Sequence, residues 1–370
     1  MTLENLLKKN QYSLTSKEKY DLLLPLLKDG IKDSLEKNKF IRTWYKKLNL
    51  NPDSIYKIED IPFLPVQMFK YFDLGFCKSN NIARVLNSSG TTENLSSKVP
   101  LDKITMQNQT KALMSTLKPY IGGKRKLFFV FDHPGENQLR LNLKARGAGI
   151  RGFEMYSSNT YYLLKSDSKN KISIDWDTLS IISELDAKTD TYCFGFTFII
   201  WEKFVLEYLK KIKISPDLPH LNLLNSNLFH SGGWKKLNEK SVTKNVFEQN
   251  ISSLFGIKIN NIHNFYGMAE QGGLIFIDCD EGYKHVPNFA SVIIRDPYHL
   301  RQSNNGETGL IQILSPLAKS YFSYSILTED LGVLIGIDDC KCGRKGEYFE
   351  FVSRIEKSEN RGCGDTFRER

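Results

Sequence analysis

The sequence predicts an α/β fold with a largely parallel sheet, and two observations support this prediction. Through the middle of the 370-residue chain, apolar runs of strand length alternate with segments of helix length, an alternation typical of parallel sheets covered by helices. Hydrophobic residues make up 41% of the chain and aromatic residues 12%. That content is sufficient for a large core and too high for a disordered chain.

The N-terminal part is predicted to be helical. Up to about residue 50, leucine, isoleucine and tyrosine recur at spacings of three and four, which places them on one face of a helix. Pro25 interrupts this pattern, so two or more helices are expected. Within residues 52 to 75, the stretch IPFLPVQMFKYFDL contains two prolines, and a packed, partly extended segment is predicted there.

The central and C-terminal parts supply the predicted strands. Glycines 147 and 149 are expected to end a helix that starts near residue 139. From about residue 283 onward, strands dominate. Strands are predicted within 126–135, 189–212, 221–235 and 257–278, and helices within 139–157, 189–212 and 239–256.

This pattern predicts three parts of the chain. Residues 1–85 form a helical segment packed on the core, and residues 86–337 form the α/β core. Residues 338–370 carry a Cys-x-Cys pair, a hinge-like stretch and a polar tail.

Charge and composition limit the partners. The formal net charge is +9, which favours acidic partners such as nucleotides, carboxylates or an acidic carrier protein. The lysines are scattered, and no basic stripe alternates with aromatic residues, so nucleic-acid binding is not predicted. No apolar run approaches the ~20 residues that cross a bilayer, and the N-terminus lacks a signal pattern. A cytoplasmic protein without a membrane span is expected.

The loop SSGTT is the first candidate for chemistry. Ser88, Ser89, Thr91 and Thr92 supply hydroxyls and backbone N–H groups, and Gly90 permits close approach of an anion. Lys98 could add a mobile charge. The Walker A spacing is absent, and a surface turn is the alternative for this loop taken alone.

Three further glycine-containing or polar loops follow apolar strands. NFYGMAEQGG (264–273) offers Tyr266 to stack on a base and Glu270 to hold Mg²⁺. HSGGWK (230–235) is a Gly-Gly turn, and Asp330 in LTEDLG (327–332) could accept hydrogen bonds from ribose hydroxyls. Each also fits an ordinary turn, and Tyr266 also fits a core position.

Taken in order, these loops and an arginine in VSRIEKSENRG resemble the acyl-adenylate-forming enzymes, which include acyl-CoA ligases and luciferase. The resemblance implies their N-terminal-type fold, ATP and Mg²⁺. It implies that the loop at 88–92 holds the triphosphate and that Asp330 binds the ribose. The remaining implied contacts are Gly232 and Gly233 beside adenine, Tyr266, Gly267 and Met268 at adenine, Glu270 at Mg²⁺, and Arg354 at a hinge.

More narrowly, the chain resembles the LuxE acyl-protein synthetase family. FLPVQMFK, SSGTT with SKVPLD, FGFTF and HSGGWK carry this likeness along essentially the whole chain. It implies that a fatty acid is activated with ATP, passed to a cysteine near the C-terminus, and then delivered to a partner reductase or acyltransferase.

The chain departs from the superfamily pattern at two places. Glu93 stands where a glycine usually follows SGTT, and two extra residues precede Lys98. The sequence also stops about sixteen residues after Arg354, so the small C-terminal domain with its catalytic lysine is expected to be lacking.

Cys363 is the predicted acyl acceptor. A thiolate is a strong nucleophile near neutral pH, and neighbouring Arg361 and Arg368 would favour it. Gly362 and Gly364 would let the tail bend. The alternative is an incidental tail cysteine. Two further functions stay open: a ligase that uses the external thiol of CoA or a carrier protein, and a non-catalytic nucleotide-binding scaffold.

The remaining cysteines suggest a metal. Cys279 and His285 lie six residues apart, and Cys340 and Cys342 form a Cys-x-Cys pair. Four nitrogen and sulfur ligands in two pairs match a closed tetrahedral zinc site. Similar pairs occur in phenylacetate-CoA ligase relatives of the superfamily. A metal-free reduced pair or a redox switch is the alternative.

Overall fold

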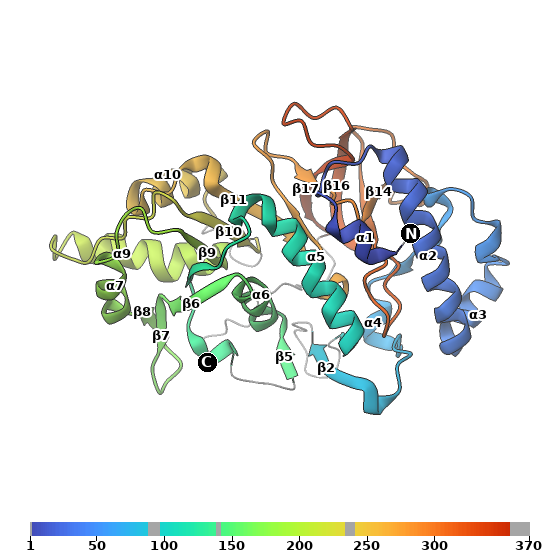
Figure 1. Ribbon diagram of the computed structural model, residues 1–370, viewed down its shortest axis with the longest axis horizontal. Coiled ribbons are helices and arrows are strands. Elements are labelled where there is room, and N and C mark those ends of the chain that lie inside the picture. The colour runs from blue at the N-terminus through green and yellow to red at the C-terminus, as the bar shows by residue number, and fades with distance from the viewer. Residues whose placement is uncertain (1, 88–96, 138–141, 234–240, 356–370) are drawn as a thin grey trace. The chain divides into compact units, whose positions relative to one another are not determined.

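The fold is described from a computed structural model. The residues described are 2–87, 97–137, 142–233 and 241–355. The described residues fall into two compact units, one within 1–116 and 266–355 and the other within 117–265. We refer to them as unit 1 and unit 2. The predicted α/β class is confirmed, with helices and strands drawn in Figure 1.

Unit 2 contains the parallel sheet. Its strands run in the order β11-β10-β9-β4-β6, and every pairing among them is parallel. Strand β12 (Ile275–Ile277) follows β11 along the chain and belongs to unit 1. The bounds are β4 Lys126–Val130, β6 Ser157–Tyr162, β9 Thr191–Phe196, β10 Asn227–Ser231 and β11 Ile262–Gly267.

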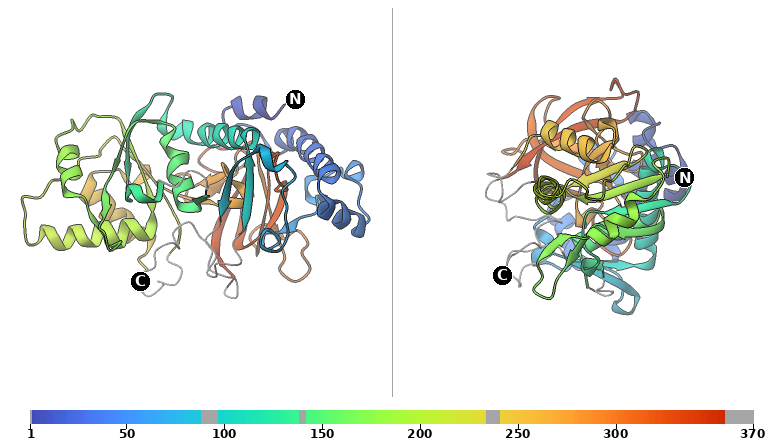
Figure 2. Two further views of the ribbon diagram at one scale, coloured as in Figure 1. Left: turned by 90° about the horizontal axis from the view of Figure 1, so that it is seen from below. Right: turned by 90° about the vertical axis from the view of Figure 1, so that its left-hand side faces the viewer.

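Helices cover this sheet, as the two views of Figure 2 show. Helix α6 (Ala145–Glu154) runs through Gly147 and Gly149, so the predicted helix end at these glycines is wrong. Gly149 instead lets α6 pack closely on β9, since a Cβ there would lie 3.4 Å from the Phe194 ring. The other helices are α7 Trp176–Ser183, α8 Thr197–Ile199, the π-helix Ile200–Val205, α9 Leu206–Ile212 and α10 Lys244–Phe255.

Unit 1 is built on an antiparallel sheet. The strand order is β13-β17-β16-β15-β14, with β1 (Leu64–Pro65) parallel to β16. The strand-rich C-terminal part of the sequence therefore forms hairpins, and the parallel arrangement belongs to unit 2. The bounds are β13 Lys284–His285, β14 Ser291–Arg295, β15 Thr308–Leu314, β16 Ser325–Ile337 and β17 Glu347–Arg354.

The predicted N-terminal helices are present, but Pro25 does not separate them. Helix α2 (Ser16–Lys37) contains Pro25 on its exposed side. Its other face buries Leu23, Leu27 and Ile31, and Thr15 with Glu18 forms a capping box at its start. Burial and capping thus offset the ~3 kcal/mol that an interior proline typically costs a helix. The breaks lie on either side of α2, whose neighbours are α1 Leu3–Lys8 and α3 Lys39–Lys47.

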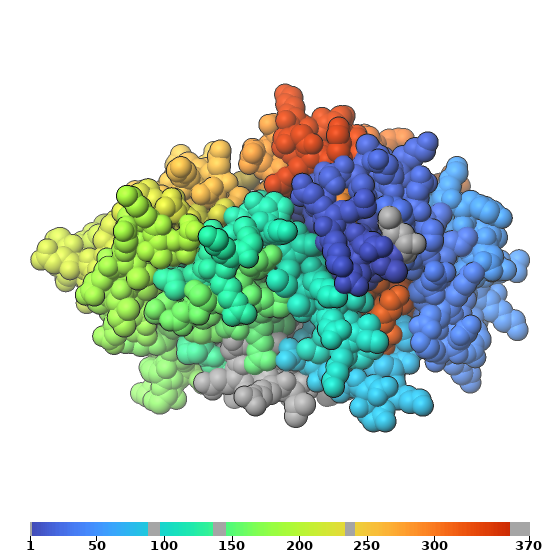
Figure 3. Space-filling view, in the orientation of Figure 1, coloured from blue at the N-terminus to red at the C-terminus, as the bar shows by residue number. Residues whose placement is uncertain are grey.

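Helix α2 packs closely on the antiparallel sheet. A Cβ at Gly30 would lie 2.2 Å from the Tyr324 ring, so only glycine permits this approach. The N-terminal helices form one side of unit 1 in the space-filling view (Figure 3). Unit 1 is completed by α4 Met68–Tyr71, the first part of α5 Lys103–Ile121, and the antiparallel pair β2 Ile82–Asn87 and β3 Lys98–Asp102. No helix among the described residues is long and apolar enough to cross a membrane.

Candidate nucleotide-binding site and cysteine-histidine cluster

Asp330 lies at the centre of a buried hydrogen-bond network in unit 1. It stands on β16 directly opposite Arg354 on β17. Arg354 Nε donates to Asp330 Oδ1 at 2.8 Å, and the Tyr266 hydroxyl donates to Oδ2 at 2.7 Å. Two donors therefore fix the orientation of the carboxylate. Because each carboxylate oxygen has a second lone pair, Asp330 can also accept from a ligand hydroxyl.

The surroundings of Tyr266 keep it a neutral donor. Its ring is buried beside Phe276 and Phe351, with centroids 5.9 and 5.3 Å away. Burial, followed by the negative charge of Asp330, raises the pKa of Tyr266 well above its ordinary value. Burial lowers the pKa of Arg354, but the Asp330 carboxylate outweighs it and the net shift is upward. The guanidinium therefore stays charged beside Asp330.

Glu270 lies in a buried turn after β11. The Tyr321 hydroxyl donates to the Glu270 carbonyl oxygen at 3.0 Å, and Gln109 Nε2 donates to that hydroxyl at 3.3 Å. Gly273 closes the turn with φ +80°, where a Cβ would lie 2.4 Å from the Gln109 carbonyl oxygen. A glycine is therefore required at this point, and the turn holds its carboxylate-bearing segment against α5.

Cys279, His285, Cys340 and Cys342 lie together in unit 1, as their pairing in the sequence predicts. All four potential ligand atoms lie within 4.8 Å of one another. Cys279 Sγ is 3.9 Å from Cys340 Sγ, and Cys342 Sγ is 3.3 Å from His285 Nε2. Bonds of about 2.0–2.3 Å to a tetrahedral zinc ion put its ligands roughly 3.3–3.8 Å apart, so this donor set fits the metal with small adjustments.

The protonation states of the cluster also suit a metal. Burial, with the charges of Arg344 and Lys19, lowers the pKa of His285 to about 3, so its imidazole is neutral near pH 7. Burial raises the pKa of Cys342 to about 12, so its thiol keeps its proton unless a cation replaces it. Of the two ring nitrogens of His285, Nε2 faces the cysteines, at 3.3 Å from Cys342 Sγ. A neutral imidazole nitrogen in this position is suited to ligation.

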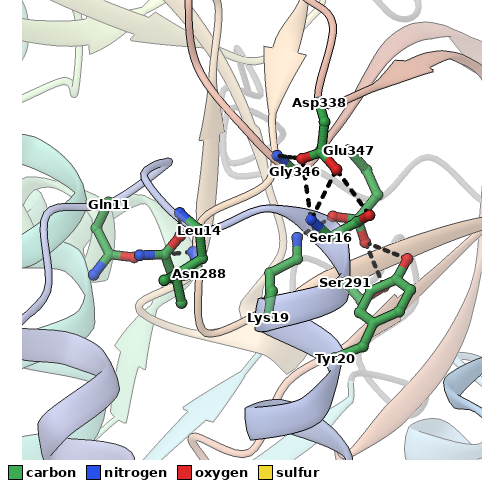
Figure 4. Close-up of polar contacts among 10 residues, drawn as sticks. All are labelled: Gln11, Leu14, Ser16, Lys19, Tyr20, Asn288, Ser291, Asp338, Gly346 and Glu347. Atoms are coloured by element: carbon green, nitrogen blue, oxygen red, sulfur yellow. Dashed lines mark hydrogen bonds and ion pairs between the residues drawn. The ribbon is translucent and has the colours of Figure 1, made fainter.

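The turn that carries the Cys-x-Cys pair is bound to helix α2 at both its ends (Figure 4). Asp338 accepts hydrogen bonds from Ser16 N at 3.0 Å, at the start of α2, and from Gly346 N at 2.7 Å. Lys19 forms an ion pair with Glu347, and both side chains are fully buried. Glu347 Oε1 also accepts from Tyr20 and Ser291. The cluster thus rests on a polar network that joins α2 to β17.

Comparison with known proteins then decides the family. The family model described as "Acyl-protein synthetase, LuxE" matches residues 3–370. The chain belongs to this family. It is therefore a ligase of the acyl-protein synthetase type, as the ordered loops of its sequence predict.

Two curated relatives support the LuxE assignment at low identity. A long-chain-fatty-acid–luciferin-component ligase of Aliivibrio fischeri is 24% identical over 318 residues, covering 84% of this chain and 79% of the relative. The Vibrio harveyi protein of the same name is 23% identical over 359 residues, with 95% and 88% covered.

Solved structures confirm the fold of this LuxE-family chain. A 2-hydroxyisobutyryl-CoA ligase in the postadenylation state, in complex with 2-HIB-AMP, matches with a TM-score of 0.68 at 14% identity. The match covers 93% of this chain and 69% of that protein. The same ligase with 2-HIB-AMP and CoA, in the thioesterification state, has a TM-score of 0.67. At this identity the likeness establishes an adenylate-forming fold.

The structure brings some of the predicted site residues together and leaves others outside its description. Tyr266, Asp330 and Arg354 form one network, and the four cysteine and histidine residues form one cluster. Lys98 is exposed at the start of β3, opposite Asn87. Gly267 ends β11, Met268 is extended, and Gly232 has φ +84° beside Gly233 after β10. The predicted loop residues Ser88, Ser89, Gly90, Thr91 and Thr92, and the predicted acceptor Cys363, lie outside the described residues.

One pair of polar side chains could not be anticipated from the sequence. In unit 2, His230 Nδ1 lies 2.9 Å from Thr197 Oγ1, and both side chains are buried. The two residues are 33 positions apart, and only the parallel pairing of β9 with β10 makes them neighbours. The available signal was that His230 lies near the C-terminal end of β10 and that Thr197 directly follows β9. Ligands of α/β proteins bind at this edge of the sheet.

Proposed function

We propose that this chain activates a long-chain fatty acid with ATP and transfers the acyl group to Cys363, for delivery to a partner reductase or acyltransferase. The observation that carries the nucleotide half of this proposal is the buried Asp330 carboxylate, held by Tyr266 and Arg354. Membership of the LuxE family and the names of the two curated relatives support the acyl half.

The first step would form an acyl-adenylate. A carboxylate oxygen of the acid attacks the α-phosphorus of ATP, a P–O bond forms, and pyrophosphate leaves with the electrons of the broken P–O bond. Asp330 would accept hydrogen bonds from the ribose hydroxyls and so position the nucleotide for in-line attack. Ser88 to Thr92 and Lys98 would bind the phosphates. Glu270 would hold Mg²⁺, whose chemistry here is to neutralise phosphate charge.

The second step would move the acyl group to sulfur. The thiolate of Cys363 attacks the acyl carbonyl carbon, a C–S bond forms, and AMP leaves as the C–O bond to phosphate breaks. A buried Tyr266 hydroxyl and a charged Arg354 keep the Asp330 carboxylate fixed throughout, because neither donor changes protonation near neutral pH.

Isotope exchange and intact mass test the two steps separately. With ATP, Mg²⁺ and a panel of saturated fatty acids, we expect acid-dependent ATP–pyrophosphate exchange and a mass increase equal to one acyl group. Cys363→Ala should keep the exchange and lose the mass increase. If that variant is still acylated, the internal acceptor is wrong. If the wild type shows exchange but transfers only to added CoA or carrier thiol, the external-thiol ligase is correct. A chain without exchange for any acid would be a nucleotide-binding scaffold.

We also propose that Cys279, His285, Cys340 and Cys342 hold a structural zinc ion. The proximity of the four donor atoms and the buried, neutral imidazole support this. With four protein ligands a zinc ion has no open position, so its role would be to join β12, β13 and the turn before β17. The charges and hydrogen bonds of α2 would hold that turn from the other side.

A further inference from the structure

Helix α3 presents a strongly basic face to solvent. Lys39, Arg42, Lys46 and Lys47 are all exposed, and the nine residues of the helix include no acidic side chain. Their spacing of three, four and one places these cations on one face, while Ile41 and Tyr45 are buried on the other. In Figure 1 this helix lies at the edge of unit 1, labelled α3.

These charges are not neutralised by the protein. Among the described residues, Lys39, Lys46 and Lys47 take part in no ion pair, whereas nearby Lys37 is paired with Asp33 at 2.6 Å. Arg42 donates to the carbonyl oxygens of Leu35 and Glu36 at the end of α2. Like charges three and four residues apart on a helix repel each other. The face is therefore locally unfavourable unless an anionic partner meets it.

Exposed aromatic side chains lie beside the N-terminal end of α3. There the Phe40 ring stacks on Phe72 with centroids 4.3 Å apart, and Phe72 is 45% exposed. Tyr71, next to Phe72 in the chain, is 61% exposed. Cations beside exposed aromatic groups are a combination found on surfaces that bind lipid.

We infer that this face, which consists of Lys39, Arg42, Lys46, Lys47, Tyr71 and Phe72, docks the protein on an anionic lipid bilayer. The cations would approach the lipid phosphates while Tyr71 and Phe72 enter the headgroup region. Basic residues attract an anionic bilayer over about one Debye length, roughly 10 Å at 0.1 M salt. Because the cations of α3 are exposed, they can come within this distance of the lipid phosphates. The exposed aromatic groups beside the cations favour a lipid surface as the occupant over an acidic protein surface.

Vesicle flotation of the full chain tests this inference without ATP or acid, so its outcome is independent of the proposed function. The probe is a vesicle of phosphatidylglycerol and phosphatidylcholine in equal parts, compared with pure phosphatidylcholine. We expect binding to the anionic vesicles at about 0.1 M salt and loss of most binding at about 1 M salt, where the Debye length falls to about 3 Å. Pure phosphatidylcholine should bind at least about tenfold less protein.

Two triple variants with the same change in charge distinguish binding by this face from a general effect of net charge. Lys39→Glu/Lys46→Glu/Lys47→Glu should lower binding at least about tenfold. Lys188→Glu/Lys211→Glu/Lys213→Glu makes the same charge change on exposed lysines of unit 2 and should change it less than about threefold. Tyr71→Ser/Phe72→Ser keeps every charge and should remove the binding that survives in salt. Circular dichroism checks the folding of each variant.

Two results would overturn the inference. If the two triple variants lose binding equally, net charge alone is responsible and α3 has no special part. If the wild type does not bind anionic vesicles at low salt, the lipid surface is wrong, and an acidic protein becomes the partner that fits these cations.

Discussion

At the scale of single residues, the site depends on side chains whose partners fix both orientation and charge. Asp330 has one donor on each oxygen, and both donors keep their protons near neutral pH. His285 is neutral and stacks on Tyr348 with ring centroids 5.3 Å apart. Such groups are organised before a ligand arrives, so binding does not require them to reorient.

Substitutions in the Asp330 network are predicted to lower kcat/KM for ATP by different amounts. Tyr266→Phe removes one hydrogen bond to a charged group, worth about 1.5–3 kcal/mol, so we expect kcat/KM for ATP to fall at least about tenfold. Asp330→Asn removes the charge that holds Arg354 and should cost about a hundredfold or more. Pyrophosphate exchange measures both effects. Tyr298→Phe, at a tyrosine that is 89% exposed, is the matched control and should leave exchange unchanged.

The proposed zinc site at the cysteine-histidine cluster predicts how much metal the protein contains and which substitution removes it. Protein purified without added zinc should contain about one zinc ion per chain, measured by plasma mass spectrometry, because four donors complete a tetrahedral site. Cys340→Ser should retain little of it and unfold at a lower temperature, since metal binding contributes directly to folding. Cys77→Ser, at a free cysteine outside the cluster, should keep its zinc. A wild-type chain with no metal would contradict the proposal and favour a reduced thiol pair.

At the scale of elements, close approaches decide which residues a turn or helix can contain. Gly273 and Gly30 both stand where a side chain would collide with a neighbour, the first with the backbone of α5 and the second with the Tyr324 ring. Helix α2 is also joined to β17 by the buried Lys19–Glu347 pair. These contacts hold in place the elements that carry Glu270 and the cysteine-histidine cluster.

Gly273 allows a controlled test of the turn that carries Glu270. Gly273→Ala adds a left-handed backbone cost of about 1–2 kcal/mol and a Cβ only 2.4 Å from the Gln109 carbonyl oxygen. Gly306→Ala is the matched control, because Gly306 has φ +86° and a Cβ added there would meet no atom within 4 Å. Urea unfolding should show a larger loss for Gly273→Ala, together with weaker Mg²⁺-dependent exchange. Equal losses would mean that the turn relaxes without strain.

The buried ion pair should be far more sensitive to removal of one partner than a surface pair is. Lys19→Met leaves the Glu347 carboxylate in a fully buried position, and breaking such a pair typically costs about 3–5 kcal/mol. Lys32→Met breaks the exposed pair with Asp53 and should cost less than about 1 kcal/mol. Denaturant unfolding compares the two. A small loss for Lys19→Met would show that Tyr20 and Ser291 alone satisfy Glu347.

At the scale of the whole molecule, the sequence predicted what repeats along the chain and missed what depends on distant contacts. Strand–helix alternation predicted the parallel sheet, and the pairing of cysteines and histidine predicted that these four side chains lie together. The helix ends predicted at Pro25 in α2 and at the glycines of α6 were wrong, because burial and close packing outweigh the local preferences of proline and glycine. The hydrogen bond between Tyr266 and Asp330 was missed for another reason: 64 residues separate them, and no periodicity in the sequence indicates a pairing of that range.

Because the chain divides into two units, removal of the proposed metal is expected to destabilise only one of them. All four candidate ligands, and the α2 contacts behind them, belong to unit 1. Chelation should therefore speed amide hydrogen exchange in β12, β13, the turn before β17 and the start of α2, because local opening follows local loss of stabilising contacts. Peptides from β9 and β10 in unit 2, which has its own parallel sheet and aromatic core, should exchange at an unchanged rate. Cys340→Ser without chelator should reproduce this pattern, and Cys77→Ser should not. Faster exchange throughout both units would show instead that the chain unfolds as one cooperative body whose stability depends on the metal.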